Sequence, residues 1–122
     1  MAAFVEEARS LTRAMELLPA RPVYKKRVDA VQELYSRIPD PPAGNEPLDE
    51  CRSLAKCIAL GFEDASEWLI IIARATKPAE KGSAADVAYG FLRQGGKLKA
   101  ALNELEAATA GGRVPKIENF KK

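Results

Sequence analysis

The first part of the chain has apolar residues at the three- and four-residue spacing of two amphipathic helices. Between residues 2 and 18 the apolar positions form one stripe, while glutamate and arginine occupy the rest of the circumference. The stripe consists of Phe4, Ala8, Leu11, Met15 and Leu18. Pro19 is expected to end this helix, and Pro22 opens a second helix that runs to about Ile38. Because few residues separate the two helices, we expect an antiparallel hairpin.

A proline-rich segment separates this hairpin from a third predicted helix. Residues 39–46 contain three prolines and a glycine, which predicts an ordered loop. Pro47 then opens a helix whose first turn carries Asp49 and Glu50, where negative charge is favoured by the helix dipole. Gly61 is the predicted end of this helix.

The most apolar segment of the chain, Trp68–Ala73, is interpreted as the middle of a buried helix. A strand in its place needs hydrogen-bonding neighbours, and the other β-branched runs are interrupted by proline. Asp64 and Glu67 have the spacing of a capping box, which favours a helix over residues 65–76. Because its apolar residues cover most of the circumference, we expect the remaining helices to enclose it.

The last part of the chain predicts two further helices and an irregular tail. Ser83 is expected to cap a helix that starts at Ala84, and Gly95-Gly96 to break it before a last helix. The sequence thus predicts an all-α fold, a compact bundle of about five to six short helices around a central apolar helix at about 65–76. Residues 1–110 are the predicted single helical domain, and residues 111–122 a basic C-terminal tail without helical period.

Residues 88–102 resemble the middle of a tetratricopeptide unit. They read Ala-Tyr-Gly-Phe-Leu-Arg-Gln-Gly-Gly-Lys-Leu-Lys-Ala-Ala-Leu, with Ala101 where the second helix of such a unit meets the first. The resemblance implies a helical hairpin that turns at Gly95-Gly96. Arrays of these units repeat about every 34 residues, and the sequence holds no second copy at that period, so we assign no family.

Length and charge limit the classes of protein to consider. A chain of 122 residues buries enough surface for one core without a disulfide or a metal ion. The balance of 19 basic and 17 acidic residues gives a net charge of +2, which by itself does not indicate nucleic-acid binding. The chain shows no export signal and no apolar run of membrane-spanning length, so we expect a cytoplasmic protein that does not enter a membrane.

The residues available for chemistry predict neither an enzyme nor a metal or cofactor site. The chain has no histidine, no Cys-x-x-Cys pair and no glycine-rich phosphate loop. Cys51 and Cys57 lie too far apart on one helix to form a disulfide, and are interpreted as small core residues. Asp49 and Glu50 are explained by the helix dipole rather than by a bound cation. We therefore expect no catalytic, cofactor-binding or metal-binding residues.

Two stretches are candidates for contact with a partner, a basic cluster on the second helix and the C-terminal tail. The candidate residues are Arg21, Tyr24, Lys25, Lys26, Arg27, Ile117, Phe120, Lys121 and Lys122. The cluster also has an ordinary structural explanation, because Lys25 and Asp29 stand four residues apart, as on a solvated helix face. The tail either docks on its own domain or contacts another protein.

The function predicted from these features is that of a non-enzymatic protein-protein interaction module. Such a module, whether adaptor, assembly subunit or small inhibitor, binds a partner protein through a helix face or the tail. The alternative is a nucleic-acid-binding protein that places the basic cluster and the tail lysines on phosphates. In that alternative Tyr24 stacks on a base.

Overall fold

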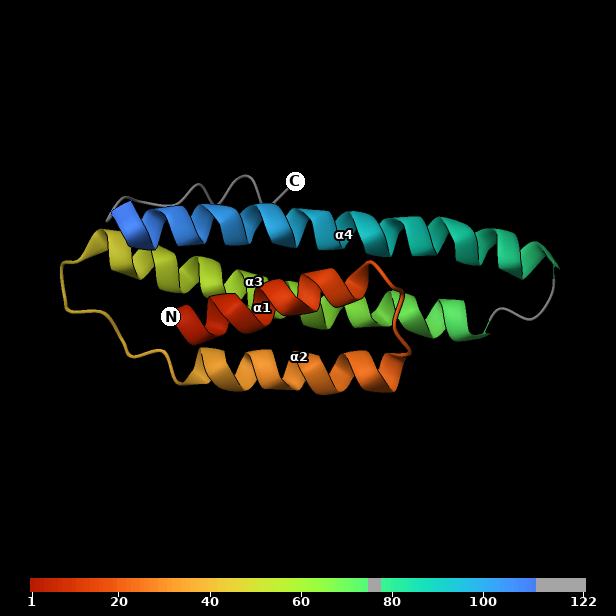
Figure 1. The fold of residues 1–122 in the computed structure, drawn as a ribbon, viewed down its shortest axis with the longest axis horizontal. Helices are drawn as coiled ribbons and strands as arrows, with labels where there is room; N and C mark the ends of the chain where they lie inside the picture. Colours follow the sequence, from red (N-terminus) through yellow and green to blue (C-terminus); the bar gives the residue numbers. More distant parts are fainter. Residues whose placement is uncertain (75–77, 112–122) are drawn as a thin grey trace.

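The structure, a computed structural model, describes residues 1–74 and 78–111, with side chains for all of these except 78–84 (Figure 1). These residues form four helices: α1 (Ala2–Met15), α2 (Arg21–Ser36), α3 (Glu46–Arg74) and α4 (Pro78–Gly111). The helices alternate in direction and pack in a ring, with α1 against α2 and α4, and α3 against α2 and α4. The all-α prediction is confirmed. The predicted number of helices is wrong, because two pairs of predicted helices are each one continuous helix.

The first hairpin forms as its apolar spacing predicts, with shorter helices. The predicted helices 2–18 and 22–38 are observed as Ala2–Met15 and Arg21–Ser36. α1 ends before Pro19 because the chain turns at Leu18, whose backbone is left-handed with φ 47°. The apolar stripe of each helix faces the core. Its buried members are Phe4, Ala8, Leu11, Met15, Tyr24, Val28 and Val31.

The third and fourth predicted helices form one helix of 29 residues, α3. Asn45 stabilises its start, because the side-chain oxygen accepts a hydrogen bond from the Leu48 N–H at 3.2 Å. Gly61, the predicted break, is buried inside the helix. A glycine costs a helix about 1 kcal/mol, which the packing of α3 against α2 and α4 outweighs. The predicted separate start at Asp64 is therefore wrong.

The last two predicted helices likewise form one helix of 34 residues, α4. It begins at Pro78 and not at Ala84, and it continues through Gly95-Gly96. Gly95 is buried where α4 meets α1, since a Cβ there would lie 3.4 Å from the Met15 sulfur. Gly95 therefore lies at a helix contact and not at a turn. The hairpin implied by the resemblance to a tetratricopeptide unit does not form, because residues 88–102 are helical throughout.

Polar contacts join helices that lie far apart in the sequence. The Arg9 guanidinium of α1 donates hydrogen bonds to Asn103 and Glu106 of α4, each at 2.9 Å. Arg52 of α3 lies over the ring of Tyr35 of α2, with 5.5 Å between the guanidinium carbon and the ring centre. These contacts close the ring between its first and last helices and fix α2 on α3.

The helices differ in length, so one end of α3 and α4 projects beyond the ring. The 14 and 16 residues of α1 and α2 span roughly half the length of the 29 and 34 residues of α3 and α4, at about 1.5 Å per residue. Figure 1 shows the C-terminal end of α3 and the N-terminal end of α4 extending past the turn between α1 and α2. Where α2 begins, Tyr24 packs edge-on against Phe91 of α4.

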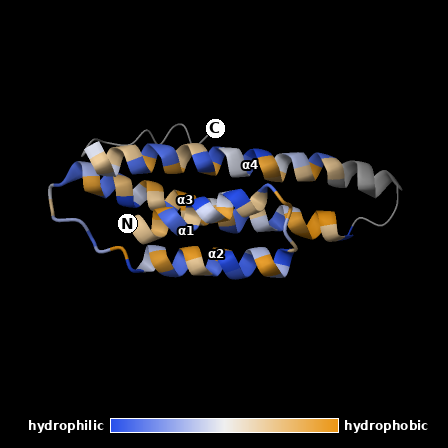
Figure 2. Ribbon diagram, viewed as in Figure 1, coloured by the Kyte–Doolittle hydropathy of each residue, from blue (hydrophilic) through white to orange (hydrophobic). Residues whose placement is uncertain are grey.

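The prediction of an enclosed central helix at about 65–76 is wrong. Its described part is the projecting end of α3, which packs on α4 but extends beyond α1 and α2 (Figure 2). Ile71 is 51% exposed and Ala73 is also exposed, whereas Leu69 is buried. The core lies between the middle parts of the four helices. Its large members include Tyr24, Ile58, Phe62, Phe91, Leu98 and Leu102.

Leu18 offers a test of backbone strain at the turn between α1 and α2. A left-handed backbone costs a residue with a β-carbon about 1–2 kcal/mol, and asparagine tolerates it better than leucine. We expect Leu18→Asn to raise the free energy of unfolding by about 0.5–1 kcal/mol in urea titration. Leu17→Asn is the control, because Leu17 is 84% exposed and lies outside the left-handed position. An equal effect of both substitutions would refute the strain explanation.

Candidate protein-binding surface

The projecting end of α3 and α4, here called the tip, comprises residues 64–74 and 85–90 among those with described side chains. It presents large apolar side chains to solvent, with Ile71 51% and Tyr89 70% exposed. Figure 2 shows the apolar end of α3 lying beyond α1 and α2. The tip is therefore a two-helix surface, whereas the rest of the molecule has four helices around its core.

Trp68 of α3 packs directly on the backbone of α4 at Gly90. A Cβ at Gly90 would lie 2.0 Å from the nearest atom of the Trp68 ring, so this approach requires a residue without a side chain. Beside the ring is an open hollow of about 290 Å³, lined by Trp68, Ile71, Asp86, Val87 and Gly90. Among the described residues of this lining, Asp86 is the titratable one. The hollow is thus an apolar recess with one carboxylate at its wall.

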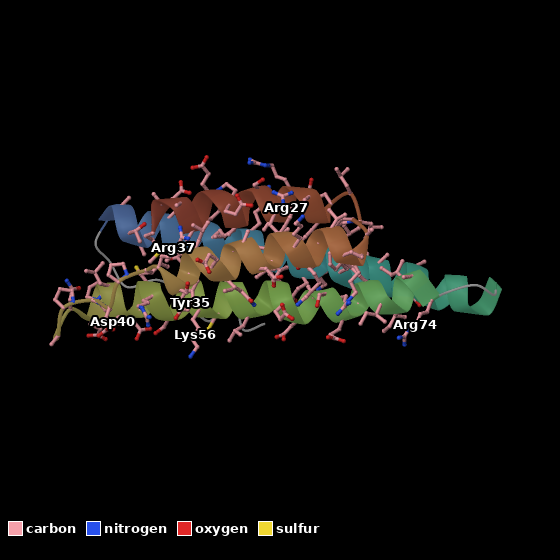
Figure 3. All side chains as sticks on the ribbon, turned by 90° about the horizontal axis from the view of Figure 1, so that it is seen from below. Arg27, Tyr35, Arg37, Asp40, Lys56 and Arg74 are labelled. Atoms are coloured by element: carbon pink, nitrogen blue, oxygen red, sulfur yellow. The ribbon has the colours of Figure 1, made fainter. Side chains whose placement is uncertain are left out.

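One face of α3 is exposed along most of the helix and carries charges of both signs. Its residues recur at three- and four-residue spacing, as on a single helix face. They are Ser53, Lys56, Leu60, Asp64, Glu67, Ile71 and Arg74. Figure 3 shows Lys56 and Arg74 pointing to the same side, away from the other helices. At the tip this face places Ile71 between a glutamate and an arginine.

The structure disperses the predicted basic cluster of α2 among different environments. Lys25 forms an ion pair with Glu63 of α3. Arg27 donates a hydrogen bond to the Ser10 hydroxyl of α1 at 2.6 Å, and its guanidinium lies 3.8 Å from Glu7. These two side chains therefore bridge α2 to its neighbours. Each ion pair is partly exposed, so each contributes little to stability, at most about 1 kcal/mol.

Tyr24 lies in the core and not on the surface. It is fully buried, its hydroxyl donates a hydrogen bond to the Phe62 carbonyl at 2.7 Å, and its ring centre lies 5.4 Å from that of Phe91. Burial raises the pKa of the Tyr24 hydroxyl above its usual value, and the negative charge of Glu63 raises it further. In this structure Tyr24 is not accessible for stacking on a base or on a partner protein.

The remaining predicted contact residues fall into two groups. Lys26 is exposed and Arg21 is half-buried on α2. The predicted tail residues Ile117, Phe120, Lys121 and Lys122 lie outside the described residues. Of the described members of the predicted site, Tyr24 is therefore in the core, and the four basic residues lie on α2 with at least part of each side chain exposed.

Sequence reasoning missed two exposed apolar surfaces. One is the tip, and the other is the turn between α1 and α2, where Leu17 is 84% and Val23 is 57% exposed. The signal for the tip was the unbroken run of three isoleucines, which points apolar side chains in all directions around α3. A single neighbouring helix covers only one side of such a run, so part of it stays exposed.

The thiols and carboxylates of the described residues suggest no further site. Cys51 is buried and Cys57 partly buried, and both are free thiols. Burial raises the pKa of the Cys51 thiol, and the charge of Glu50 adds to the effect. Among the described residues, no group of three or more cysteine, aspartate or glutamate residues is arranged to hold a metal ion. In the same part of the chain, no helix combines the length and apolarity needed to cross a bilayer.

No family model, curated protein or solved structure matches this chain. Function is therefore inferred from the geometry of the tip.

Proposed function

We propose that the protein is a non-enzymatic interaction module that binds a partner protein through the tip. The observation that carries this proposal is the projection of α3 and α4 beyond α1 and α2, which leaves Ile71 and Tyr89 exposed at the most apolar part of the chain. Fully burying an isoleucine is worth about 1.5–3 kcal/mol. A helix pair that exposes such residues gains stability when another protein covers them.

The composition of the tip supports protein binding rather than catalysis. Tryptophan and tyrosine are enriched among the residues that contribute most to interfaces, and the tip has Trp68 beside a hollow and Tyr89 in solvent. Charged residues surround these apolar groups, as in the polar rim of an interface. They are Asp64, Glu67, Arg74, Asp86 and Arg93. The hollow itself is lined by one carboxylate and apolar groups, a poor arrangement for acid-base or nucleophilic chemistry.

A cytoplasmic location is part of the proposal. The two thiols, Cys51 and Cys57, are both free, which suits a reducing compartment. The dispersed basic cluster lends no specific support to the nucleic-acid alternative, so protein binding is the function we put forward.

Site-specific photo-crosslinking in the cells that produce the protein tests this proposal. A photoreactive amino acid replaces Ile71 or Tyr89 at the tip, and replaces Ala30 of α2 as the exposed control. We expect the two tip positions to give the same adducts with another polypeptide, and the control position to give none of them. Mass spectrometry of the adducts then identifies the polypeptide, including a second copy of this chain.

Two outcomes of this experiment would overturn the proposal. One is the absence of protein adducts at both tip positions. The other is an identical set of adducts at positions 30, 71 and 89, which would indicate nonspecific capture. Circular dichroism of each labelled protein confirms that it is folded, which is expected because all three positions are exposed.

A further inference from the structure

The exposed face of α3 at the tip has a charge pattern that is complementary to itself. Glu67 and Arg74 are exposed on this face, with Ile70 and Ile71 between them. Neither charged side chain forms an ion pair with another described residue of the chain. They stand seven residues apart, about 10 Å along the helix, too far to pair with each other.

An antiparallel second copy of α3 matches this pattern in one register. With the two-fold axis between Ile70 and Ile71, Glu67 of each copy lies opposite Arg74 of the other. The isoleucines then meet at the centre, between two symmetric ion pairs. Such a two-fold contact uses the same patch on both subunits.

A register that pairs Leu60 with Ile71 is disfavoured by charge. Leu60, 50% exposed, lies on the same face and could meet Ile71 if the axis lay between Ala65 and Ser66. That register brings Asp64 of each copy opposite Glu67 of the other, and like charges in contact oppose association. Of these two registers, charge favours the one centred on the two isoleucines, which also lies wholly on the tip.

We propose that the tip binds a second copy of this chain, in an antiparallel dimer centred between Ile70 and Ile71. This inference rests on the proposed function, because it names the occupant of the same site. The hollow next to Ile71 gives the isoleucines of the second copy an apolar surface to contact. The two molecules meet end to end, since only the tips overlap in this register.

The contact is small, so association is expected to be weak and dependent on concentration. An interface limited to about two turns of one helix and an adjoining hollow falls below about 1,200 Å², the range of transient complexes. Sedimentation velocity from about 1 µM to about 1 mM therefore covers the transition expected for this class. We expect a monomer at the lower end and a dimer at the upper end.

Charge reversal tests the register. Glu67→Lys and Arg74→Glu each place like charges at both pairs of the homodimer, which is expected to weaken association about tenfold. An equimolar mixture of these two variants, in contrast, forms a heterodimer in which both pairs are attractive. The mixture is expected to recover the affinity of the unaltered protein, and so is the double variant Glu67→Lys/Arg74→Glu.

Lys56→Glu is the matched control. Lys56 lies on the same face of α3 as Arg74 and points to the same side, but it is outside the overlap of the tips (Figure 3). The substitution changes the charge as much as Arg74→Glu does, and is expected to leave the dimer within about twofold of the unaltered protein. Helical circular dichroism confirms that the charge variants remain folded.

Three results would overturn the dimer. They are a monomer at every concentration, equal weakening by Lys56→Glu and Arg74→Glu, and failure of the mixed variants to recover affinity. These results leave the proposed function testable, because the photo-crosslinks at positions 71 and 89 then come from a different protein or are absent. If the photo-crosslinks join the tip to another polypeptide and sedimentation shows only a monomer, the dimer is refuted and the proposed function is not. Absence of both would refute the dimer and the proposed function together.

Discussion

Replacing Tyr24 with alanine is expected to lower the free energy of unfolding by about 3–5 kcal/mol, the cost of removing a large aromatic side chain from a packed core. Tyr24 is fully buried between Phe62 of α3 and Phe91 of α4, at the point where α2 begins. Removing the Tyr24 ring leaves a cavity where the four-helix part of the molecule adjoins the tip. Chemical denaturation followed by circular dichroism measures the effect.

Tyr89 provides the matched control for this prediction. It is a tyrosine on α4 that is 70% exposed, so Tyr89→Ala is expected to change the free energy of unfolding by no more than about 0.5 kcal/mol. Comparable losses at the two positions would show that Tyr24 does not occupy the core.

Tyr24→Phe isolates the hydroxyl group from the ring. It removes the hydrogen bond to the Phe62 carbonyl while the ring stays, with an expected loss of about 0.5–1.5 kcal/mol near neutral pH. Because burial raises the pKa of Tyr24, the folded protein retains this proton at a pH where the unfolded chain has lost it. The contribution of the neutral hydroxyl is therefore complete below about pH 10 and is lost as the pH rises above that value.

The pH dependence gives a second measurement on the same variant. Above about pH 10 the unfolding free energy of the unaltered protein is expected to fall more steeply than that of Tyr24→Phe, by up to about 1.4 kcal/mol per pH unit. Parallel curves for the two proteins between about pH 8 and pH 11 would contradict the buried, neutral state of Tyr24.

Gly90→Ala is expected to displace Trp68 from α4 and to destabilise the protein by about 1–2 kcal/mol. The new Cβ would lie 2.0 Å from the Trp68 ring, so the ring must move into solvent. The gain in helix propensity, about 1 kcal/mol, offsets part of the loss. Trp68 is the only tryptophan in the chain, so its fluorescence reports the displacement as a shift to longer wavelength.

Gly96→Ala is the matched control for Gly90→Ala. Gly96 is in the same helix, and a Cβ there meets nothing within 4 Å. This substitution is expected to raise the free energy of unfolding by up to about 1 kcal/mol and to leave the fluorescence unchanged. Opposite signs for the two alanine variants are the decisive result. A stabilised Gly90→Ala protein with unshifted fluorescence would refute the contact of Trp68 with the backbone of α4.

The sequence predicted the first hairpin because its signals are local. The apolar stripe from Phe4 to Met15 and the prolines at 19 and 22 define two short helices whatever lies around them. The predicted breaks at Gly61 and Gly95-Gly96 failed because helix continuity there depends on neighbours. Gly61 and Gly95 are both buried, and Gly95 lies against Met15 of α1, so tertiary packing outweighs the low helix propensity of glycine at these positions.

The exposed tip was not found from the sequence for a related reason. Whether Ile71 is covered depends on where α1 and α2 end relative to α3, and this follows from the lengths of all four helices once they are packed. Tyr24 was assigned to the surface because its neighbours are basic, but lysine and arginine flank a buried position readily when they reach across to Glu63 and Glu7. The charge alternation on α3 was present in the sequence. Recognising it as a contact surface required knowing which face of α3 is exposed.

The closure of the ring by α1 and α4 has a consequence for the protein during its synthesis. Arg9 and its two partners on α4 are 94 and 97 residues apart, so these contacts form only after α4 has been translated. Translation proceeds at about 5–20 residues per second, so α1, α2 and α3 are present without α4 for several seconds. Throughout that interval the side of Met15 that later faces Gly95 of α4 is open to water and to chaperones. The nascent chain therefore cannot bury its core completely until α4 has been made.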